Sequence, residues 1–177
     1  MICRMLETIQ QYEPAARTVA TSNLHLTLKF LGTTPRSSIP AITETLDQIA
    51  GLTGGFSVLL EGCGAFPRLE SPSVLWLGFR NNQPLQELIE LAAVTEKELV
   101  HSGFAADDRR FQPHLTIARL KHRKSPSISS LIQKHARTSL GQLMVDHIEL
   151  IESTLQPDGP VYTTIHRAEL RSKAIQK

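Results

Sequence analysis

Two short stretches of this chain place a threonine two residues after a histidine. His25 and Thr27 lie in Leu24-His25-Leu26-Thr27-Leu28, and His114 and Thr116 lie in Pro113-His114-Leu115-Thr116-Ile117. The chain has 7 histidines in 177 residues, so random placement gives fewer than one such triplet. A repeated His-Leu-Thr within two strand-like runs is therefore a meaningful pattern. We interpret the two pairs, which are about half the chain apart, as the two halves of one site.

Both stretches have the alternation that is typical of a half-buried strand. Successive side chains of a strand point to opposite faces, so each histidine shares a face with its threonine. The leucine and isoleucine side chains between and beside them point to the other face. The repeat predicts two similar lobes, each of which contributes one pair.

Two histidines without a nearby serine or cysteine nucleophile suit paired general acid and base catalysis. The ordinary pKa of imidazole, about 6.5, allows one ring to take a proton while another gives one near neutral pH. A hydroxyl from each side would hold a phosphate whose charge grows in the transition state. The pattern predicts in-line attack on a phosphodiester, without a metal ion or a covalent intermediate.

Two other interpretations of the histidines remain open. A histidine on a strand is often only part of a half-buried sheet, although the repetition argues against this for both. A zinc site usually adds cysteine, aspartate or glutamate ligands, and neither stretch supplies one.

Composition limits the class of protein. A chain of 177 residues with 41% hydrophobic and 20% charged residues suits one globular domain or two closely packed halves. A net charge of +2 tolerates a phosphate-bearing partner but is far from that of a polybasic nucleic-acid binder. Cys3 and Cys63 are too few for a disulfide framework, which indicates a reducing compartment. Without a long apolar run or the apolar core of a signal peptide, we expect a cytoplasmic protein with no membrane partner.

Apolar periodicity predicts both helices and strands along the chain. Helices are expected at 2–11, 37–52, 84–101 and 127–137, and strands at 23–31, 56–61, 73–79, 114–120, 144–154 and 161–170. A tight loop is expected at 62–67, a basic turn at 121–124 and a strong turn at 157–160. This order favours an α+β protein with antiparallel sheets and helices on one side. Trp76 lies in an apolar run and is expected in the core.

The two motifs, continued as far as Gly32 and Arg119, resemble the two signatures of the 2H phosphoesterase superfamily. The most similar branch is the RNA 2',3'-cyclic phosphodiesterases, also called 2'-5' RNA ligases. Gly64-Ala65-Phe66-Pro67, Val74-Leu75-Trp76-Leu77-Gly78 and Tyr162-Thr163 also resemble that branch. The resemblance extends from about Pro14 to Leu170.

The resemblance implies a bilobal α+β fold, with two antiparallel sheets and outer helices around a central cleft. It also implies hydrolysis of an RNA 2',3'-cyclic phosphate to a 2'-phosphomonoester without a cofactor or metal. His25 falls on the family's proton donor and His114 on its proton acceptor. Thr27 and Thr116 fall on the phosphate-binding threonines, and Arg119 on an arginine that follows the second motif.

Three details differ from the family or from simple strand parity. Family members usually begin with a strand before the first helix, whereas this chain opens in that helix at Ile2, so the first strand is expected to be missing. Strict alternation puts Arg119 on the face opposite His114, so a bulge or twist is needed for it to contact phosphate. Lys29 shares the His25 face by parity, and we expect it to be solvated.

The expected partner is an RNA that ends in a 2',3'-cyclic phosphate, or a small cyclic nucleotide, bound by a monomer. The same site would allow the reverse 2'-5' joining, since acid and base exchange roles on reversal. The alternative from another class is a non-catalytic module that binds RNA ends or nucleotides.

Overall fold

A computed structural model describes residues 1–121, 125–156 and 159–172. The chain order is α1 (Ile2–Tyr12), β1 (Arg17–Thr18), η1 (Thr21–Asn23), η2 (Arg36–Ser38), α2 (Ile39–Leu52), β2 (Phe56–Phe66), β3 (Val74–Phe79), α3 (Gln83–His101), β4 (Leu115–Arg119), α4 (Pro126–His135), β5 (Ser139–Val145), β6 (His147–Gln156) and β7 (Gly159–Glu169). The chain forms two compact units. Unit 1 contains Met1–Thr27, Val58–Leu85 and Gln112–Leu143, and unit 2 contains Leu28–Ser57, Gln86–Phe111 and Met144–Lys177.

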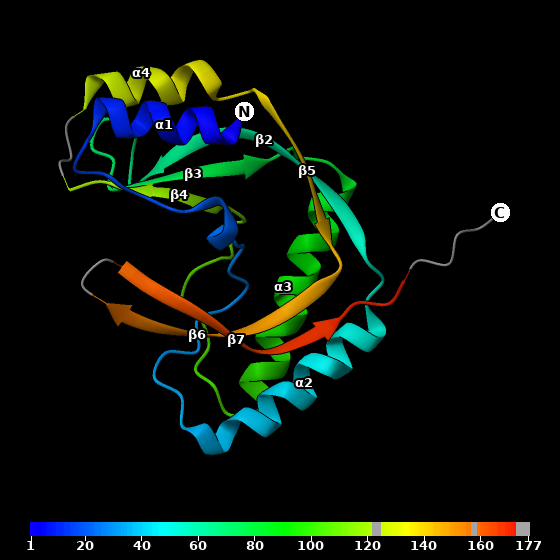
Figure 1. The fold of residues 1–177 in the computed structure, drawn as a ribbon. Coiled ribbons are helices and arrows are strands. Elements are labelled where there is room, and N and C mark those ends of the chain that lie inside the picture. Colours follow the sequence, from blue (N-terminus) through cyan, green and yellow to red (C-terminus); the bar gives the residue numbers. More distant parts are fainter. Residues whose placement is uncertain (122–124, 157–158, 173–177) are drawn as a thin grey trace. The chain divides into compact units, whose positions relative to one another are not determined.

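The main sheet has five strands in the order β1-β4-β3-β2-β5. The β1–β4, β4–β3 and β3–β2 pairs are antiparallel. Helices α1 and α4 lie side by side over one face of this sheet (Figure 1). The two helices cover this face with apolar side chains, since α1 buries Met5 and Ile9 and α4 buries Ile128 and Ile132.

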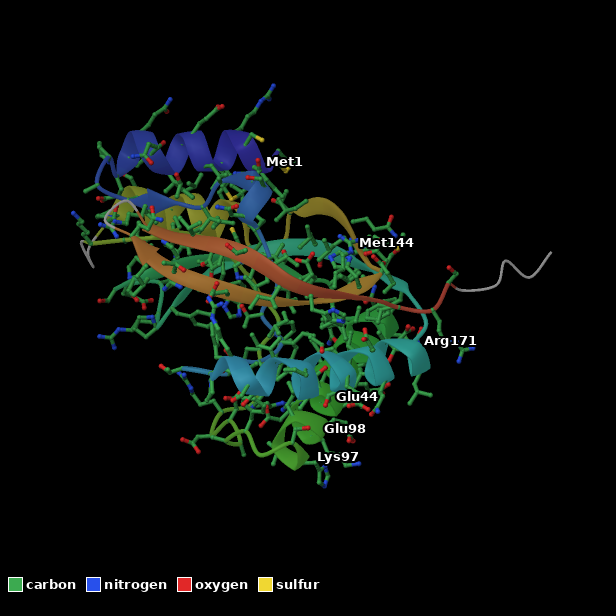
Figure 2. The ribbon with its side chains drawn as sticks, turned by 60° about the horizontal axis from the view of Figure 1, so that its bottom comes forward. Met1, Glu44, Lys97, Glu98, Met144 and Arg171 are labelled. Atoms are coloured by element: carbon green, nitrogen blue, oxygen red, sulfur yellow. The ribbon has the colours of Figure 1, made fainter. Side chains whose placement is uncertain are left out.

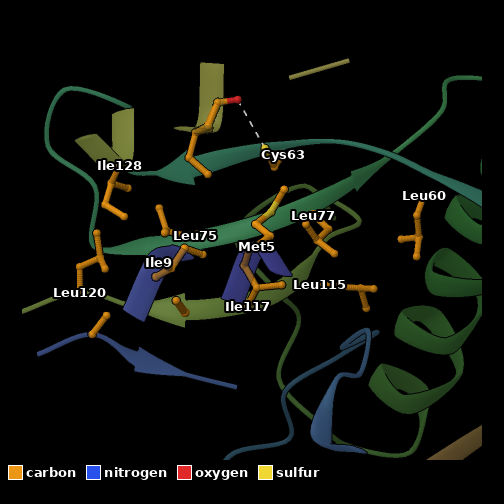
Figure 3. Close-up of a cluster of buried hydrophobic side chains, with 13 residues drawn as sticks. Met5, Ile9, Leu60, Cys63, Leu75, Leu77, Leu115, Ile117, Leu120 and Ile128 are labelled. Carbon is orange, nitrogen blue, oxygen red and sulfur yellow. Dashed lines mark hydrogen bonds between the residues drawn. The ribbon is translucent and has the colours of Figure 1, made fainter. Parts of the chain in front are cut away.

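The core of unit 1 lies between these helices and the sheet. Side chains of α1, β3 and β4 meet there, with Ile9, Leu75, Leu77 and Ile117 fully buried (Figure 3). Burial of each such side chain contributes about 1.5–3 kcal/mol. The Cys63 thiol of β2 also faces this core, where its Sγ donates a hydrogen bond to the Ile132 carbonyl. One face of the sheet thus packs against the helices, so polar side chains of the strands lie on the other face.

Unit 2 is built from α2, most of α3 and the two-stranded antiparallel sheet β6–β7. Helix α2 buries Ile42, Leu46 and Ile49 on one face, at helical spacing. The hydroxyls of Thr45 and Ser102 lie 3.2 Å apart and join α2 to the end of α3. Figures 1 and 2 show α2 and α3 next to each other.

The expected α+β class and the antiparallel sheets are confirmed, as are all four helices to within a few residues. The strand expected at 23–31 is wrong, because η1 occupies 21–23 and only Leu26 makes a β-bridge in this stretch. The loop expected at 62–67 is also wrong. There Gly62 adopts φ +76° at an irregularity of β2, which lets the strand continue to Phe66. The single strand expected at 144–154 is divided between two strands in the structure, the end of β5 and most of β6. Most of the basic turn at 121–124 and half of the turn at 157–160 lie outside the described residues.

Candidate active site

Both His–Thr pairs belong to unit 1. His25 and Thr27 end the first segment of that unit, while His114 and Thr116 open its last segment. The expectation that each lobe contributes one pair is therefore wrong. The internal repeat of the sequence reflects two neighbouring segments of one unit, because sequence distance says nothing about which sheet a segment joins.

A single β-bridge sets the two motifs against each other. Leu26 pairs with Leu115 in an antiparallel sense, and both leucines contact the core. Continuing this register by one residue on either side puts His25 opposite Thr116 and Thr27 opposite His114. Residues directly opposite in an antiparallel pair have Cβ atoms about 4.5–5.5 Å apart. The bridge thus brings the two motifs alongside each other within unit 1.

The two imidazoles are held in the same way. His25 Nδ1 lies 2.8 Å from the Asn23 carbonyl oxygen, and His114 Nδ1 lies 2.7 Å from the Gln112 carbonyl oxygen. A carbonyl only accepts hydrogen bonds, so Nδ1 carries the hydrogen in both rings. In the neutral ring Nε2 is then the basic atom, and in the charged ring Nε2–H is a proton donor. Each ring therefore has Nε2 as the nitrogen that can gain or lose a proton.

A bulge in β4 brings Arg119 to the same face as the motif. In the β3–β4 pair Trp76 lies opposite Thr116, whereas Leu75, which precedes Trp76, lies opposite Ala118. Ile117 of β4 is therefore the extra residue of the bulge. Cross-strand partners share a face, and Leu75 and Ala118 are both fully buried in the core. Arg119, the next residue, consequently lies on the Thr116 face. This bulge meets the condition that strand parity imposed on Arg119.

Sequence reasoning missed Arg17. In the β1–β4 pair Arg17 lies directly opposite Arg119, and both side chains are exposed. Like charges directly opposite each other are unfavourable unless an anion lies between them. This pair makes the edge of the site face electropositive. No local pattern marks Arg17, because β1 is only two residues long.

Trp76 was expected in the core, and this is wrong. It lies between the fully buried Leu75 and Leu77 and points to the opposite face, where it is half-buried. The Phe66 ring contacts it at 5.3 Å and contacts His114 edge-to-face at 5.1 Å. The alternation of faces along a strand identifies the side on which Trp76 lies, because it stands between two core residues in Val74-Leu75-Trp76-Leu77.

Lys29 was expected to be solvated, and this is also wrong. Its side chain is 2% exposed and its Nζ contacts Glu96 Oε2 at 2.5 Å and the Ala105 carbonyl at 2.8 Å. The other oxygen of Glu96 accepts a hydrogen bond from the Asp107 backbone N–H at 2.8 Å. All four residues belong to unit 2. The sequence did not indicate this cluster, because α3 and two separate loops supply it.

Within residues 1–121, 125–156 and 159–172, no three His, Cys, Asp or Glu side chains converge as metal ligands would. In the same ranges, none of the helices combines the length and the apolar character that a membrane crossing needs.

Comparison with known proteins identifies the family. The profile of the 2'-5' RNA ligase superfamily matches residues 1–156. A protein of Archaeoglobus fulgidus named RNA 2',3'-cyclic phosphodiesterase is 36% identical over 82% of this chain and 79% of its own length. One of the same name from Aeropyrum pernix is 31% identical over 97% of this chain and 96% of its own length.

Solved structures give the same result. The crystal structure of TT0787 of Thermus thermophilus has a TM-score of 0.76 and 26% identity, over 98% of this chain and 91% of that one. E. coli LigT complexed with 3'-AMP has a TM-score of 0.69 and 26% identity, over 94% and 91%. Fold, paired motifs and relatives lead to one conclusion: the chain belongs to the 2'-5' RNA ligase superfamily, within the 2H phosphoesterases.

Proposed function

We propose that this protein hydrolyses the 2',3'-cyclic phosphate at the end of an RNA, leaving a 2'-phosphomonoester. The observation that carries the proposal is the antiparallel Leu26–Leu115 bridge, which brings two His–Thr pairs together on one face. The relatives named RNA 2',3'-cyclic phosphodiesterase support the same activity. A cyclic phosphodiester needs one proton removed from water and one supplied to the leaving oxygen, and two imidazoles provide both.

In the proposed reaction His114 is the base and His25 is the acid. His114 Nε2 takes a proton from water as the water oxygen forms a bond to phosphorus. The bond from phosphorus to the 3' oxygen breaks, and His25 Nε2–H gives its proton to that oxygen. Proton exchange with solvent then restores the two rings. The Nδ1 hydrogen bonds to the Asn23 and Gln112 carbonyls support these roles, because they hold the hydrogen on Nδ1 and make Nε2 the nitrogen at which each ring exchanges a proton.

Thr27 and Thr116 bind the non-bridging oxygens of the phosphate in this proposal. Their positions opposite the two histidines put a hydroxyl next to each proton transfer, where negative charge grows in the transition state. Arg119 supplies a guanidinium from the same face. Arg17 opposite it adds a second positive charge, which suits the polyanionic backbone of RNA.

The site also suits a small cyclic nucleotide and the reverse reaction, 2'-5' joining, in which the acid and base exchange roles. We propose that a single chain is the working unit. Both His–Thr pairs come from one compact unit of one chain, so no second copy is needed to complete the site.

The proposal is tested with an oligonucleotide that ends in a 2',3'-cyclic phosphate, in the presence of a chelator. We expect release of a 2'-phosphate, and His25→Ala and His114→Ala should each reduce turnover by about 10²- to 10⁴-fold. His101→Ala, a histidine at the end of α3, is the matched control and should keep normal turnover.

Three results would each contradict a different part of this proposal. Near-normal turnover in either motif variant would contradict the two-histidine mechanism. Loss of activity in chelator would contradict the metal-free mechanism. Tight binding of the oligonucleotide without turnover by the native chain would favour the non-catalytic module instead.

A further inference from the structure

The indole of Trp76 lies over the backbones of β2 and β3. A Cβ added to Gly64 of β2 would be 2.2 Å from Cζ2 of the indole, and one added to Gly78 of β3 would be 3.2 Å from its Cζ3. The ring therefore occupies the space above both glycines, instead of standing away from the sheet. Glycine at these two positions is what allows a large ring to rest there.

This indole is continuous with the candidate active site. Trp76 is the cross-strand partner of Thr116, and Phe66 bridges the gap from the indole to the His114 ring. Trp76 is half-buried, so part of the residue remains accessible to solvent on this face. An aromatic surface thus begins directly beside the groups proposed to act on the phosphate.

A cavity of about 320 Å³ opens over this surface. Trp76, Gly78 and Pro113 contribute to its wall, and Pro113 precedes His114. Ligand sites span roughly 300–1,000 Å³, so the cavity suits one nucleoside and not a longer stretch of RNA. Glu61 also lines it, but Arg80 neutralises this carboxylate through contacts of 2.6 and 2.7 Å, so the wall does not repel a nucleotide.

The indole nitrogen indicates how recognition works. Trp76 Nε1 is buried from solvent and has no hydrogen-bond partner among the residues that the structure describes. The N–H is thus turned away from any ligand, and the ring face is what Trp76 can offer. A ring face stacks on every base, since each base has a π-face.

Resting on the function proposed above, we propose that Trp76 and this cavity bind the nucleobase of the terminal nucleotide by stacking. The base is attached to the ribose that carries the cyclic phosphate, so it must lie beside the reacting group. Because the contact is a stack without a hydrogen bond from the indole, the subsite accepts purines and pyrimidines alike.

The kinetic test compares adenosine 2',3'-cyclic monophosphate with ribose 2',3'-cyclic phosphate, which lacks the base. The measured quantity is the ratio of kcat/KM for the two substrates. Trp76→Leu should lower this ratio on the order of ten-fold, mainly through KM, because the stack is lost. Trp76→Phe keeps an aromatic ring and should restore most of the ratio. Tyr12→Leu, an exposed aromatic at the end of α1 on the core side of the sheet, is the control and should leave the ratio as in the native chain.

A second readout is independent of turnover. Trp76 is the only tryptophan in the chain, so intrinsic fluorescence reports this position alone. Adenosine 2'-monophosphate should quench it, and inorganic phosphate should not.

The outcomes separate this inference from the proposed function. Hydrolysis of both substrates with an unchanged ratio in Trp76→Leu and no quenching would overturn the base subsite and leave the activity intact. Equal losses on both substrates would make Trp76 purely structural, which also overturns it. If the native chain hydrolysed neither substrate and also left the cyclic-phosphate oligonucleotide intact, the proposed function would fail, while nucleotide-specific quenching would still support the subsite.

Discussion

Replacing Glu96 with glutamine removes the charge that balances a buried ammonium. The Lys29 side chain is 2% exposed, and Glu96 is 29% exposed. Removing one partner of a fully buried pair costs about 3–5 kcal/mol. Here Asp107 remains 4.0 Å from the Lys29 Nζ, and the Ala105 carbonyl still accepts its hydrogen bond. We therefore expect Glu96→Gln to lower the free energy of unfolding by about 2–3 kcal/mol.

The measurement is urea unfolding followed by far-ultraviolet circular dichroism. Glu98→Gln is the matched control, because Glu98 is 42% exposed on the same helix and its pair with Lys97 is at 3.5 Å (Figure 2). An exposed pair of this kind contributes about 0–1 kcal/mol. Lys29→Met combined with Glu96→Gln should recover part of the loss, since no unpaired ammonium then remains buried.

The pKa shift of Glu96 determines how the stability difference between the native chain and Glu96→Gln depends on pH. Partial burial raises the pKa of Glu96, but the hydrogen bonds from Lys29 and the Asp107 backbone and the Lys29 charge outweigh it, so the pKa is lowered. A lowered folded-state pKa stabilises the protein above the unfolded value of about 4.3, and this is lost as pH falls through the folded value. The gap between the native chain and Glu96→Gln should be largest near neutrality and close in acid.

Two results would refute this reasoning. One is an equal effect of Glu96→Gln and Glu98→Gln on unfolding at neutral pH. The other is a gap between the native chain and Glu96→Gln that does not change between pH 7 and strong acid.

Other regions of unit 1 and unit 2 give two further predictions. Burial raises the pKa of the Cys63 thiol to about 11, so a thiol reagent should label the exposed Cys3 quickly in the folded protein and Cys63 only after denaturation; prompt labelling of both would contradict the packing. Gly62→Ala should destabilise by more than about 1 kcal/mol, because Gly62 has φ +76° and a Cβ there would lie 2.4 Å from the Ala136 carbonyl oxygen. Gly51→Ala, at an open helical position of α2, should instead stabilise by about 0.5–1 kcal/mol in the same unfolding assay; the same sign for both would contradict the steric argument.

The sequence by itself determined the helices and the catalytic candidates. The spacing of Ile42, Leu46 and Ile49 is enough to predict α2, because a helix depends on residues three and four apart. The repeated His-x-Thr likewise identified His25 and His114, since the chemistry requires those residue types. The α+β class followed from the order of the elements.

Only the tertiary structure decided which segments meet. The motifs lie in one unit and not in two, because one bridge from Leu26 to Leu115 closes between residues far apart in the chain. The extra residue Ile117 turns Arg119 to the site face, and such a bulge depends on the neighbouring strand. The same holds for Lys29, whose partner Glu96 comes from α3. In each case the deciding contact is non-local, and local periodicity carries no information about it.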